Sequence, residues 1–272
     1  MADEPAAGKK VTIRDIVRMK RGGKKIVVVT AYDVLFAKLV DSAGVDMVLV
    51  GDSLGNVVAG FDTTLSVTID QMIYHGAAVR RGIKRALLVV DMPFLTYQAS
   101  EESAILNCGR VLQQTEADAV KVEGGSEDMI RIVRRLTQTG IPIVAHLGFT
   151  PQSVRTIGMR VQGREQSDAE KMVDQARALE EAGAFALVLE LIPSDLAKKI
   201  SEAIAIPTIG IGAGPHCDGQ VLVLPDLLGL NDGFEPKFLK KYADLAVTVR
   251  KAVGKFGEEV RSGEYPDAEH SN

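Results

Sequence analysis

Short apolar runs, each followed by a segment with helical spacing, recur along most of this sequence. The runs are rich in Val, Ile and Leu and show little apolar–polar alternation, as strands do when both faces of a parallel sheet are covered. Eight such runs can be recognised: Ile26–Thr30, Met47–Val50, Ala86–Val90, Ala119–Val122, Ile141–Ala145, Ala186–Leu189, Thr208–Ile211 and Gln220–Leu224. The pattern therefore predicts eight parallel strands.

The segments between the runs carry apolar residues on one helical face. Met172, Ala176 and Leu179 share such a face, and Val133 and Leu136 share another. Residues that favour helix N-caps precede several of the segments: Asp33, Ser100, Ser126 and Ser194. Alternating strands and helices predict an α/β fold with a parallel sheet.

Eight strand–helix units in about 250 residues match the size of a (β/α)8 TIM barrel. An open, doubly wound sheet is the alternative, but its usual Gly-x-Gly-x-x-Gly does not follow the first run, which continues directly into Ala31. We expect a single catalytic barrel domain over 11–262, with flexible tails at 1–10 and 263–272. Within that domain, 236–262 is predicted to form a long closing helix.

The composition narrows the class of protein. The chain has 272 residues, 46% hydrophobic and 25% charged, with a formal net charge of −4. This mildly acidic balance argues against a general nucleic-acid binder and against a polybasic membrane anchor. No apolar run is long enough to span a bilayer, and the acidic start does not resemble a secretory signal. Cys108 and Cys217 form neither a disulfide framework nor a zinc motif. We therefore expect a cytoplasmic protein.

Most of the candidate chemistry follows the predicted strands directly. In a barrel of this kind the active site lies at the carboxyl ends of the strands. The residues found at those ends, in chain order, are Asp52, Ser53, Asp91, Lys121, Glu123, His146 and Glu190. The sequence therefore predicts that four carboxylates, a lysine and a histidine gather on one rim of the barrel.

Asp52, Asp91 and Glu123 come from consecutive strands, so their carboxylates can converge. Crowded carboxylates repel one another unless they share a proton or a cation, and oxygen-only ligands suit Mg²⁺. The alternative is that each acid caps the next helix or pairs with an arginine, but three acids from neighbouring strands beside Lys121 favour a metal site. His146 could bind the metal, contact substrate, or be satisfied within the rim.

Two glycine-containing segments also adjoin the predicted rim. Gly210–Gly214 follows the seventh run and could let backbone N–H groups approach a ligand, or could simply form a tight turn. The stretch 148–167 has no clear periodicity and follows His146. A loop of that length in a compact fold is often functional, and we expect it to act as a lid.

A set of short motifs runs in the same order as in a known family. These are Thr30-Ala31-Tyr32-Asp33, Gly51-Asp52-Ser53-Leu54-Gly55, Tyr74-His75, Asp91-Met92-Pro93-Phe94, Lys121-Val122-Glu123-Gly124-Gly125, His146-Leu147-Gly148, Thr150-Pro151-Gln152, Val161-Gln162-Gly163-Arg164 and Gly210-Ile211-Gly212-Ala213-Gly214. With Glu190 and the tail motifs near Tyr265, they span nearly the whole chain from about residue 11. The sequence resembles the ketopantoate hydroxymethyltransferase family.

The resemblance implies a Mg²⁺-dependent (β/α)8 barrel. The family transfers a one-carbon unit from 5,10-methylenetetrahydrofolate to 3-methyl-2-oxobutanoate, giving 2-dehydropantoate and tetrahydrofolate on the pathway to pantothenate. The resemblance also implies aldol-type chemistry through a Mg-stabilised enolate, and a decameric assembly.

Residue by residue, the resemblance assigns three kinds of role. The positions that match metal ligands are Asp52, Asp91 and Glu123. Those that match oxo-acid contacts are Asp52, Ser53, Asp91 and Lys121, to which we add His146 as a candidate. Glu190 matches the family's proton acceptor, so we expect it to be the catalytic base.

Two other functions are compatible with a barrel of this type. A Mg²⁺-dependent 2-oxo-acid lyase or mutase of the isocitrate lyase and phosphonomutase type would share the fold. The lyases carry a catalytic Cys in a Lys-Lys-Cys-Gly-His loop, which is absent here. A non-catalytic metabolite-binding barrel is the alternative from another class, and the intact carboxylate set argues against it.

Overall fold

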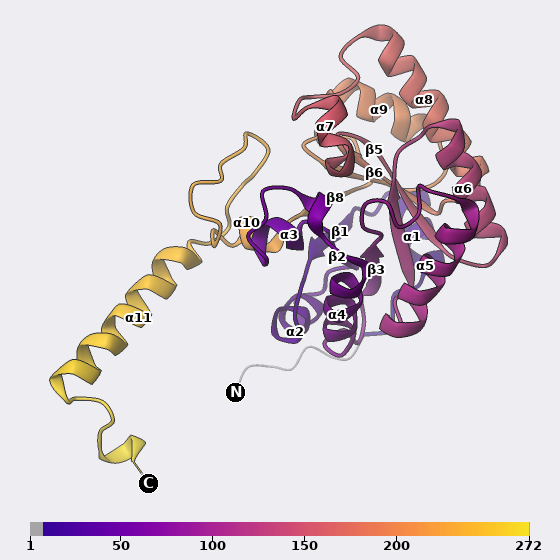
Figure 1. The fold of residues 1–272 in the computed structure, drawn as a ribbon. Coiled ribbons are helices and arrows are strands. Elements are labelled where there is room, and N and C mark those ends of the chain that lie inside the picture. Colours follow the sequence, from indigo (N-terminus) through magenta and orange to yellow (C-terminus); the bar gives the residue numbers. More distant parts are fainter. Residues whose placement is uncertain (1–7, 272) are drawn as a thin grey trace. The chain divides into compact units, whose positions relative to one another are not determined.

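The computed structural model describes residues 8–271, so most of the predicted tail at 1–10, and Asn272, lie outside the described residues. Eight parallel strands form a closed barrel in which each strand pairs with its neighbours in sequence, and β8 pairs with β1 (Figure 1). The strands are β1 (Ile26–Thr30), β2 (Met47–Val50), β3 (Leu87–Asp91), β4 (Ala119–Glu123), β5 (Ile143–Gly148), β6 (Ala186–Glu190), β7 (Thr208–Ile211) and β8 (Gly219–Leu222). The predicted TIM barrel is confirmed.

Helices occupy the connections from β1 to β7 and surround the barrel (Figure 1), whereas the short connection between β7 and β8 consists of turns. Up to β8 they are α1 (Ile13–Arg21), α2 (Val34–Ser42), α3 (Leu54–Val57), η1 (Thr64–Ser66), α4 (Ile69–Arg80), α5 (Glu101–Thr115), α6 (Glu127–Gln138), η2 (Pro151–Ser153), α7 (Val154–Ile157), α8 (Gln166–Glu181) and α9 (Ser194–Ala203). Asp33, Ser100 and Ser126 cap their helices as predicted. Ser194 does not, because α9 begins at this residue and Pro193 occupies the N-cap position.

Alternation along the strands explains how the barrel interior divides into two halves. Residues two apart on a strand point to the same side, so Leu87 and Val89 share the inward face of β3 with Asp91. In β4 the inward positions are Ala119, Lys121 and Glu123. The first residue of each series belongs to the apolar core, which Ile16 of α1 closes at the amino end. In these two strands the inward side chains are therefore apolar at the amino end and polar from Asp91 and Lys121 onward.

Some strand bounds differ from the predicted ones. The run Ile141–Ala145 predicts a strand that starts too early, because Pro142 has no N–H for the ladder and β5 begins at Ile143. Strands β3, β4 and β6 continue into Asp91, Glu123 and Glu190, so these acids are the last residues of their strands rather than part of the following loops.

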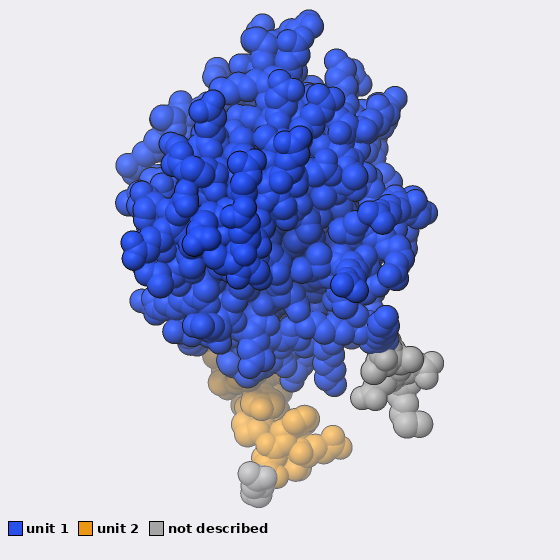
Figure 2. Space-filling model, turned by 90° about the vertical axis from the view of Figure 1, so that its right-hand side faces the viewer, with its two compact units in different colours: residues 1–223 blue, residues 224–272 orange. Residues whose placement is uncertain are grey.

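The chain forms two compact units, 1–223 and 224–272, coloured separately in Figure 2. The second unit contains α10 (Leu224–Leu227), α11 (Leu245–Ser262) and η3 (Ala268–His270). The predicted helix over 236–262 is therefore too long at its start. The backbone N–H of Tyr242 donates to the Leu227 carbonyl and the Asp244 side chain caps α11, so residues 236–244 are not helical and the helix begins at Leu245.

The stretch 148–167 is less irregular than its sequence indicates, because it contains η2, α7 and the first two residues of α8. Among the described residues, none of the helices combines the length and apolar character needed to cross a bilayer.

Candidate active site

Neighbouring strands place four site residues in two adjacent pairs. Asp91 of β3 is the register partner of Lys121 of β4, and Glu123 of β4 is the register partner of His146 of β5. All four side chains are nearly inaccessible to solvent. The alternation of β3, β4 and β5 therefore brings two acids, a lysine and a histidine together inside the carboxyl end of the barrel.

Asp52 joins this group from the turn after β2. Its backbone N–H donates to Asp91 Oδ2 at 3.1 Å. Gly51 makes the turn possible, because a Cβ there would lie 2.7 Å from Ser53 Oγ and 3.6 Å from Asp91 Oδ2. The three acids predicted to bind a metal thus lie in one buried cluster.

Lys121 lies at the centre of the cluster. Its Nζ is 3.2 Å from Asp91 Oδ1, 3.6 Å from Glu123 Oε1 and 3.2 Å from His146 Nδ1. Burial by itself lowers the pKa of Lys121, but attraction to Asp91 and the neighbouring acids outweighs it and raises the pKa above its usual range. The ammonium therefore stays charged and partly neutralises the buried acids.

The three acids keep their protons more strongly than exposed carboxyls do. Burial, together with the charge of Glu123, raises the pKa of Asp52 to about 6, although Lys121 opposes the shift. Burial also raises the pKa of Asp91 to about 7 against the attraction of Lys121, and it raises the pKa of Glu123. One lysine does not balance three buried carboxylates, so the cluster has an affinity for a further proton or cation.

His146 links the cluster to Glu190 of β6. Its Nε2 is 3.3 Å from Glu190 Oε2, without the alignment of a hydrogen bond, while Nδ1 faces Lys121. Burial and the charge of Lys121 lower the pKa of His146, so the ring is neutral near pH 7. Because an ammonium can only donate, Nδ1 accepts from Lys121 and the ring proton is assigned to Nε2, facing Glu190.

Glu190 differs from the other acids in being reachable from solvent, with 17% of its side chain exposed. Burial raises its pKa, and the contact with His146 partly opposes the shift. A carboxylate with a raised pKa and access to a ligand has the properties of a general base.

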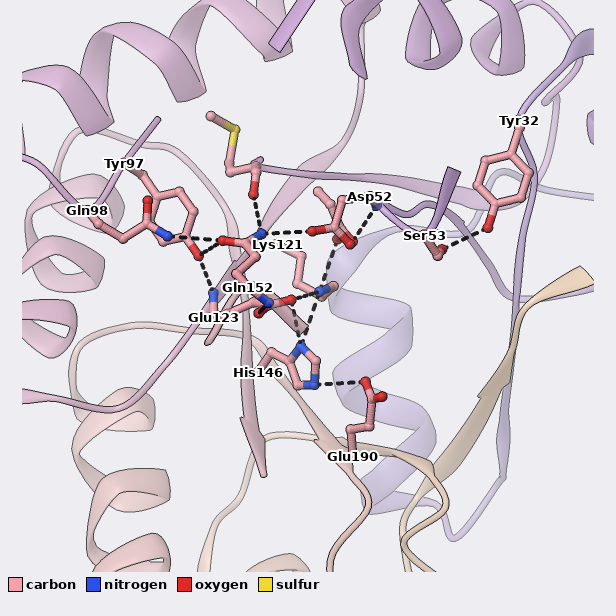
Figure 3. A network of polar contacts seen from close by, with 12 residues as sticks. Tyr32, Asp52, Ser53, Tyr97, Gln98, Lys121, Glu123, His146, Gln152 and Glu190 are labelled. Carbon is pink, nitrogen blue, oxygen red and sulfur yellow. Dashed lines mark hydrogen bonds and ion pairs between the residues drawn. The ribbon is translucent and has the colours of Figure 1, made fainter. Parts of the chain in front are cut away.

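Ser53 lies apart from the acids. Its Oγ is 2.8 Å from the Tyr32 hydroxyl, and the pair stands to one side of the cluster in Figure 3. The structure thus brings Asp52, Asp91, Lys121, Glu123, His146 and Glu190 into one network and leaves Ser53 at its edge.

Sequence reasoning gives no polar role to Gln152, Tyr97 or Gln98, which complete the network in Figure 3; it considers Tyr97 only as part of a pocket wall formed by Phe94–Tyr97. Gln152 precedes α7 in the stretch predicted to be a lid, and its side chain donates to Asp52 Oδ2 at 2.9 Å. The only sequence signal was the membership of Gln152 in one of the family-like motifs. Tyr97 and Gln98 lie in a loop without periodicity, so no pattern marks them.

The donor chemistry of the cluster fits a hard divalent cation. All three candidate ligands offer oxygen, and the buried Asp91 Oδ1 makes an ion pair with Lys121 but no hydrogen bond. Within residues 8–271, however, no three His, Cys, Asp or Glu side chains are arranged to hold a metal ion by themselves. A cation at this place would therefore need further oxygen ligands, such as those of a substrate.

The glycines after β7 fit the tight-turn alternative. Gly212 and Gly214 have positive φ angles of 62° and 79°. A Cβ on Gly214 would lie 2.3 Å from Ser194 Oγ, so packing against α9 accounts for this glycine.

A closed parallel barrel with acids, a lysine and a neutral histidine buried at the carboxyl ends of its strands defines an enzyme of the TIM-barrel class. The family model for ketopantoate hydroxymethyltransferase matches residues 10–268, and the chain belongs to this family. The resemblance seen in the sequence is thereby confirmed.

Curated relatives agree with the family model. The chain is 55% identical over 264 residues to a 3-methyl-2-oxobutanoate hydroxymethyltransferase of Pelobacter propionicus, covering 97% of each chain. It is 53% identical over 263 residues to one of Moorella thermoacetica, covering 96% of this chain and 97% of the relative. At this similarity the chain is an enzyme of the hydroxymethyltransferase type, and the non-catalytic alternative is not supported.

Solved structures share the fold at much lower identity. A 2,3-dimethylmalate lyase aligns with a TM-score of 0.60 and 15% identity, covering 96% of this chain and 91% of that one. A phosphonopyruvate hydrolase, described in complex with oxalate and Mg²⁺, aligns with a TM-score of 0.62 and 13% identity, covering 95% and 93%. These likenesses concern the barrel alone, so they do not favour the lyase or mutase alternative.

Proposed function

We propose that this chain transfers a hydroxymethyl group from 5,10-methylenetetrahydrofolate to 3-methyl-2-oxobutanoate. Water is the further co-reactant, and the products are 2-dehydropantoate and tetrahydrofolate, in pantothenate biosynthesis. The observation that carries the proposal is the buried cluster at the carboxyl end of the barrel. It combines carboxylates and Lys121 with Glu190, a group suited to remove the C3 proton of the oxo acid. Membership of the family supports the choice of substrates.

Mg²⁺ is the proposed cofactor, with Asp52, Asp91 and Glu123 as the residues that would hold it. When bound, the ion would act as a Lewis acid on the 2-oxo group and make the neighbouring C3–H more acidic. The buried negative charge left unbalanced by Lys121 supports this assignment, as does the Mg²⁺ complex described for a protein of the same fold.

Glu190 is the proposed base that removes the C3 proton. Its raised pKa lies closer to neutral pH than that of an exposed glutamate, which suits proton transfer, and its partial exposure leaves room for substrate. His146, with its proton on Nε2, would hold the Glu190 carboxylate in place. Lys121 would offset the negative charge of the oxo acid, and Ser53 would help to position it beside Asp52 and Asp91.

Proton exchange at C3 of 3-methyl-2-oxobutanoate in D₂O, followed by NMR, tests the first half of the reaction without folate. We expect exchange that requires Mg²⁺ and is abolished by a chelator, and product only when 5,10-methylenetetrahydrofolate is added. Exchange that is independent of metal would contradict the proposed metal role. Absence of product with both substrates and Mg²⁺ would contradict the proposed function.

Self-association and a cytoplasmic location are further parts of the proposal, and both come from the family resemblance and the composition. Light scattering after size exclusion chromatography tests the first, with a decamer as the expected result.

A further inference from the structure

The amide of Gln152 has all four of its hydrogen-bonding positions occupied. Nε2 donates to Asp52 Oδ2 at 2.9 Å and to the Met92 carbonyl at 2.8 Å. Oε1 accepts from the Tyr97 hydroxyl at 2.8 Å and from Gln98 Nε2 at 3.0 Å. A buried amide with every donor and acceptor used has one orientation, and a neighbour bonded to it is held in one place as well.

Tyr97 determines which way this amide faces. Its hydroxyl accepts from the backbone N–H of Glu123 at 3.0 Å, so its own proton goes to Gln152 Oε1. Burial raises the pKa of Tyr97 well above its usual range, and the proton therefore stays on the oxygen. A flipped amide would set Oε1 against the carboxylate of Asp52 and the carbonyl of Met92, which are both acceptors.

Gln152 also binds a second acid through its backbone. Its N–H donates to Glu123 Oε2 at 3.1 Å, while Glu123 Oε1 faces Lys121 and His146. One residue thus occupies one oxygen in each of two acids, one in the turn after β2 and the other at the end of β4. Its own side chain is buried, with 6% of the residue exposed.

We propose that Gln152, held by Tyr97, is a positioning residue that orients the carboxylates of Asp52 and Glu123 for the divalent cation. The inference rests on the proposed function, because it concerns the affinity of the same site for Mg²⁺. Hydrogen bonds to ligating carboxylates fix their orientation, and loss of such a partner typically costs about 10–100-fold in metal affinity or activity.

The alternative is that Gln152 only anchors the start of the loop that follows β5. Gln152→Met separates the two roles, because it keeps the length of the side chain and removes its hydrogen bonds. Calorimetry with Mg²⁺ titrated into protein saturated with 3-methyl-2-oxobutanoate measures the affinity of the site. We expect the Mg²⁺ dissociation constant to rise by about 10–100-fold, with the KM of the oxo acid at saturating Mg²⁺ near the wild-type value.

Tyr97→Phe provides a second variant that introduces no new polar group and tests the chain of contacts. It should also weaken Mg²⁺ binding, and its effect should be smaller in the Gln152→Met background than in the wild type, because Tyr97 acts partly through Gln152. The matched control is Gln113→Met, since Gln113 is exposed on α5 and contacts none of the acids. This control should bind Mg²⁺ as the wild type does.

Wild-type Mg²⁺ affinity in folded Gln152→Met protein would overturn the inference while leaving the proposed function intact. If Gln152→Met fails to fold, unchanged affinity in Tyr97→Phe overturns it instead. If the wild-type protein itself does not bind Mg²⁺ with the oxo acid, the proposed function fails first and this inference with it.

Discussion

Acidic residues occur at both ends of the barrel, and the two ends use them differently. At the amino end, Asp46, Asp118 and Asp218 each precede a strand and accept the backbone N–H of a residue at the start of the neighbouring strand. Each also faces a basic side chain: Arg85, Arg80 and Lys20 respectively. These amino-end acids therefore have their own donors, and their role is to hold strand starts together.

At the carboxyl end, the acids face one another instead. Asp52, Asp91 and Glu123 share a single lysine, and burial raises the pKa of each. An acidic side chain thus stabilises the fold where backbone N–H donors and its own basic partner surround it. Where it is buried beside other acids, its pKa is raised and it becomes a candidate for catalysis or metal binding. The comparison shows that the surroundings of an acid, more than its position at a strand end, decide its role.

The largest expected difference between the two ends is in catalysis. Glu190→Gln keeps the shape of the side chain and removes its basicity, so C3 proton exchange should fall by about 10²–10⁴-fold. The variant should still bind Mg²⁺ and the oxo acid. Asp118→Asn is the control from the amino end and should exchange the proton at close to the wild-type rate. If Glu190→Gln exchanges at the wild-type rate, the assignment is wrong and His146 becomes the next candidate base.

For folding stability we expect the opposite: a substitution at the amino end should cost more than one at the carboxyl end. Asp41, at the amino end, accepts the backbone N–H groups of Lys84, Arg85 and Ala86. Asp41→Ala leaves these donors without their partner, at about 1–3 kcal/mol for a buried unsatisfied group. Asp91→Asn removes one charge from a crowded cluster, so it should leave metal-free stability unchanged or raise it.

Urea denaturation in the presence of a chelator measures both variants. A lower urea midpoint for Asp41→Ala than for Asp91→Asn is expected. A midpoint for Asp91→Asn that falls as far as that of Asp41→Ala would remove the distinction between the two ends.

The carboxyl-end side of this contrast could be predicted from the sequence. The apolar runs indicate buried parallel strands, and counting to the end of each run places Asp91, Glu123 and Glu190 on one rim. That reasoning works because strands have a fixed period and parallel strands share a common end.

Two features could not be predicted, for the same physical reason. Gln152 reaches the acids from the short η2 and Tyr97 from a loop, and neither segment is long enough or regular enough for periodicity to relate sequence position to direction. The start of α11 depends on the bond from Tyr242 to the Leu227 carbonyl, a contact between segments that helical spacing cannot reveal. Contacts made by segments without a regular period therefore become visible only in the structure.

The acidity of the carboxyl end also predicts a pH dependence of stability. An acid whose pKa is raised in the folded state binds its proton more tightly there than in the unfolded chain, so folding is weakened as pH rises through that range. With pKa values of about 6 for Asp52 and about 7 for Asp91, metal-free stability should fall between about pH 4 and 7. For these two acids alone the expected loss is about 3 kcal/mol between pH 5 and 7.

Thermal melting in a chelator at pH 5, 6 and 7 measures this slope. Asp91→Asn should flatten it, because the group with the higher pKa is then absent. Mg²⁺ with oxo acid should restore stability most at pH 7, where the ligands are deprotonated. An equal slope in wild type and Asp91→Asn would show that the carboxyl-end acids do not cause it.

The smallest expected effect concerns the stretch 148–167, which we predict to act as a lid. Gln152 ties its start to Asp52, while Arg155, Arg160 and Arg164 are exposed further along. A ligand that fixes the carboxyl-end acids should therefore reduce the motion of this stretch, which would then shield the reacting carbon from water. Trypsin cleavage after the three arginines should slow several-fold with Mg²⁺ and oxo acid, as followed by mass spectrometry. Cleavage after the exposed Lys24, at the amino end, is the internal control and should not change. Equal protection at both ends would indicate general stabilisation, and no protection at the arginines would contradict the lid.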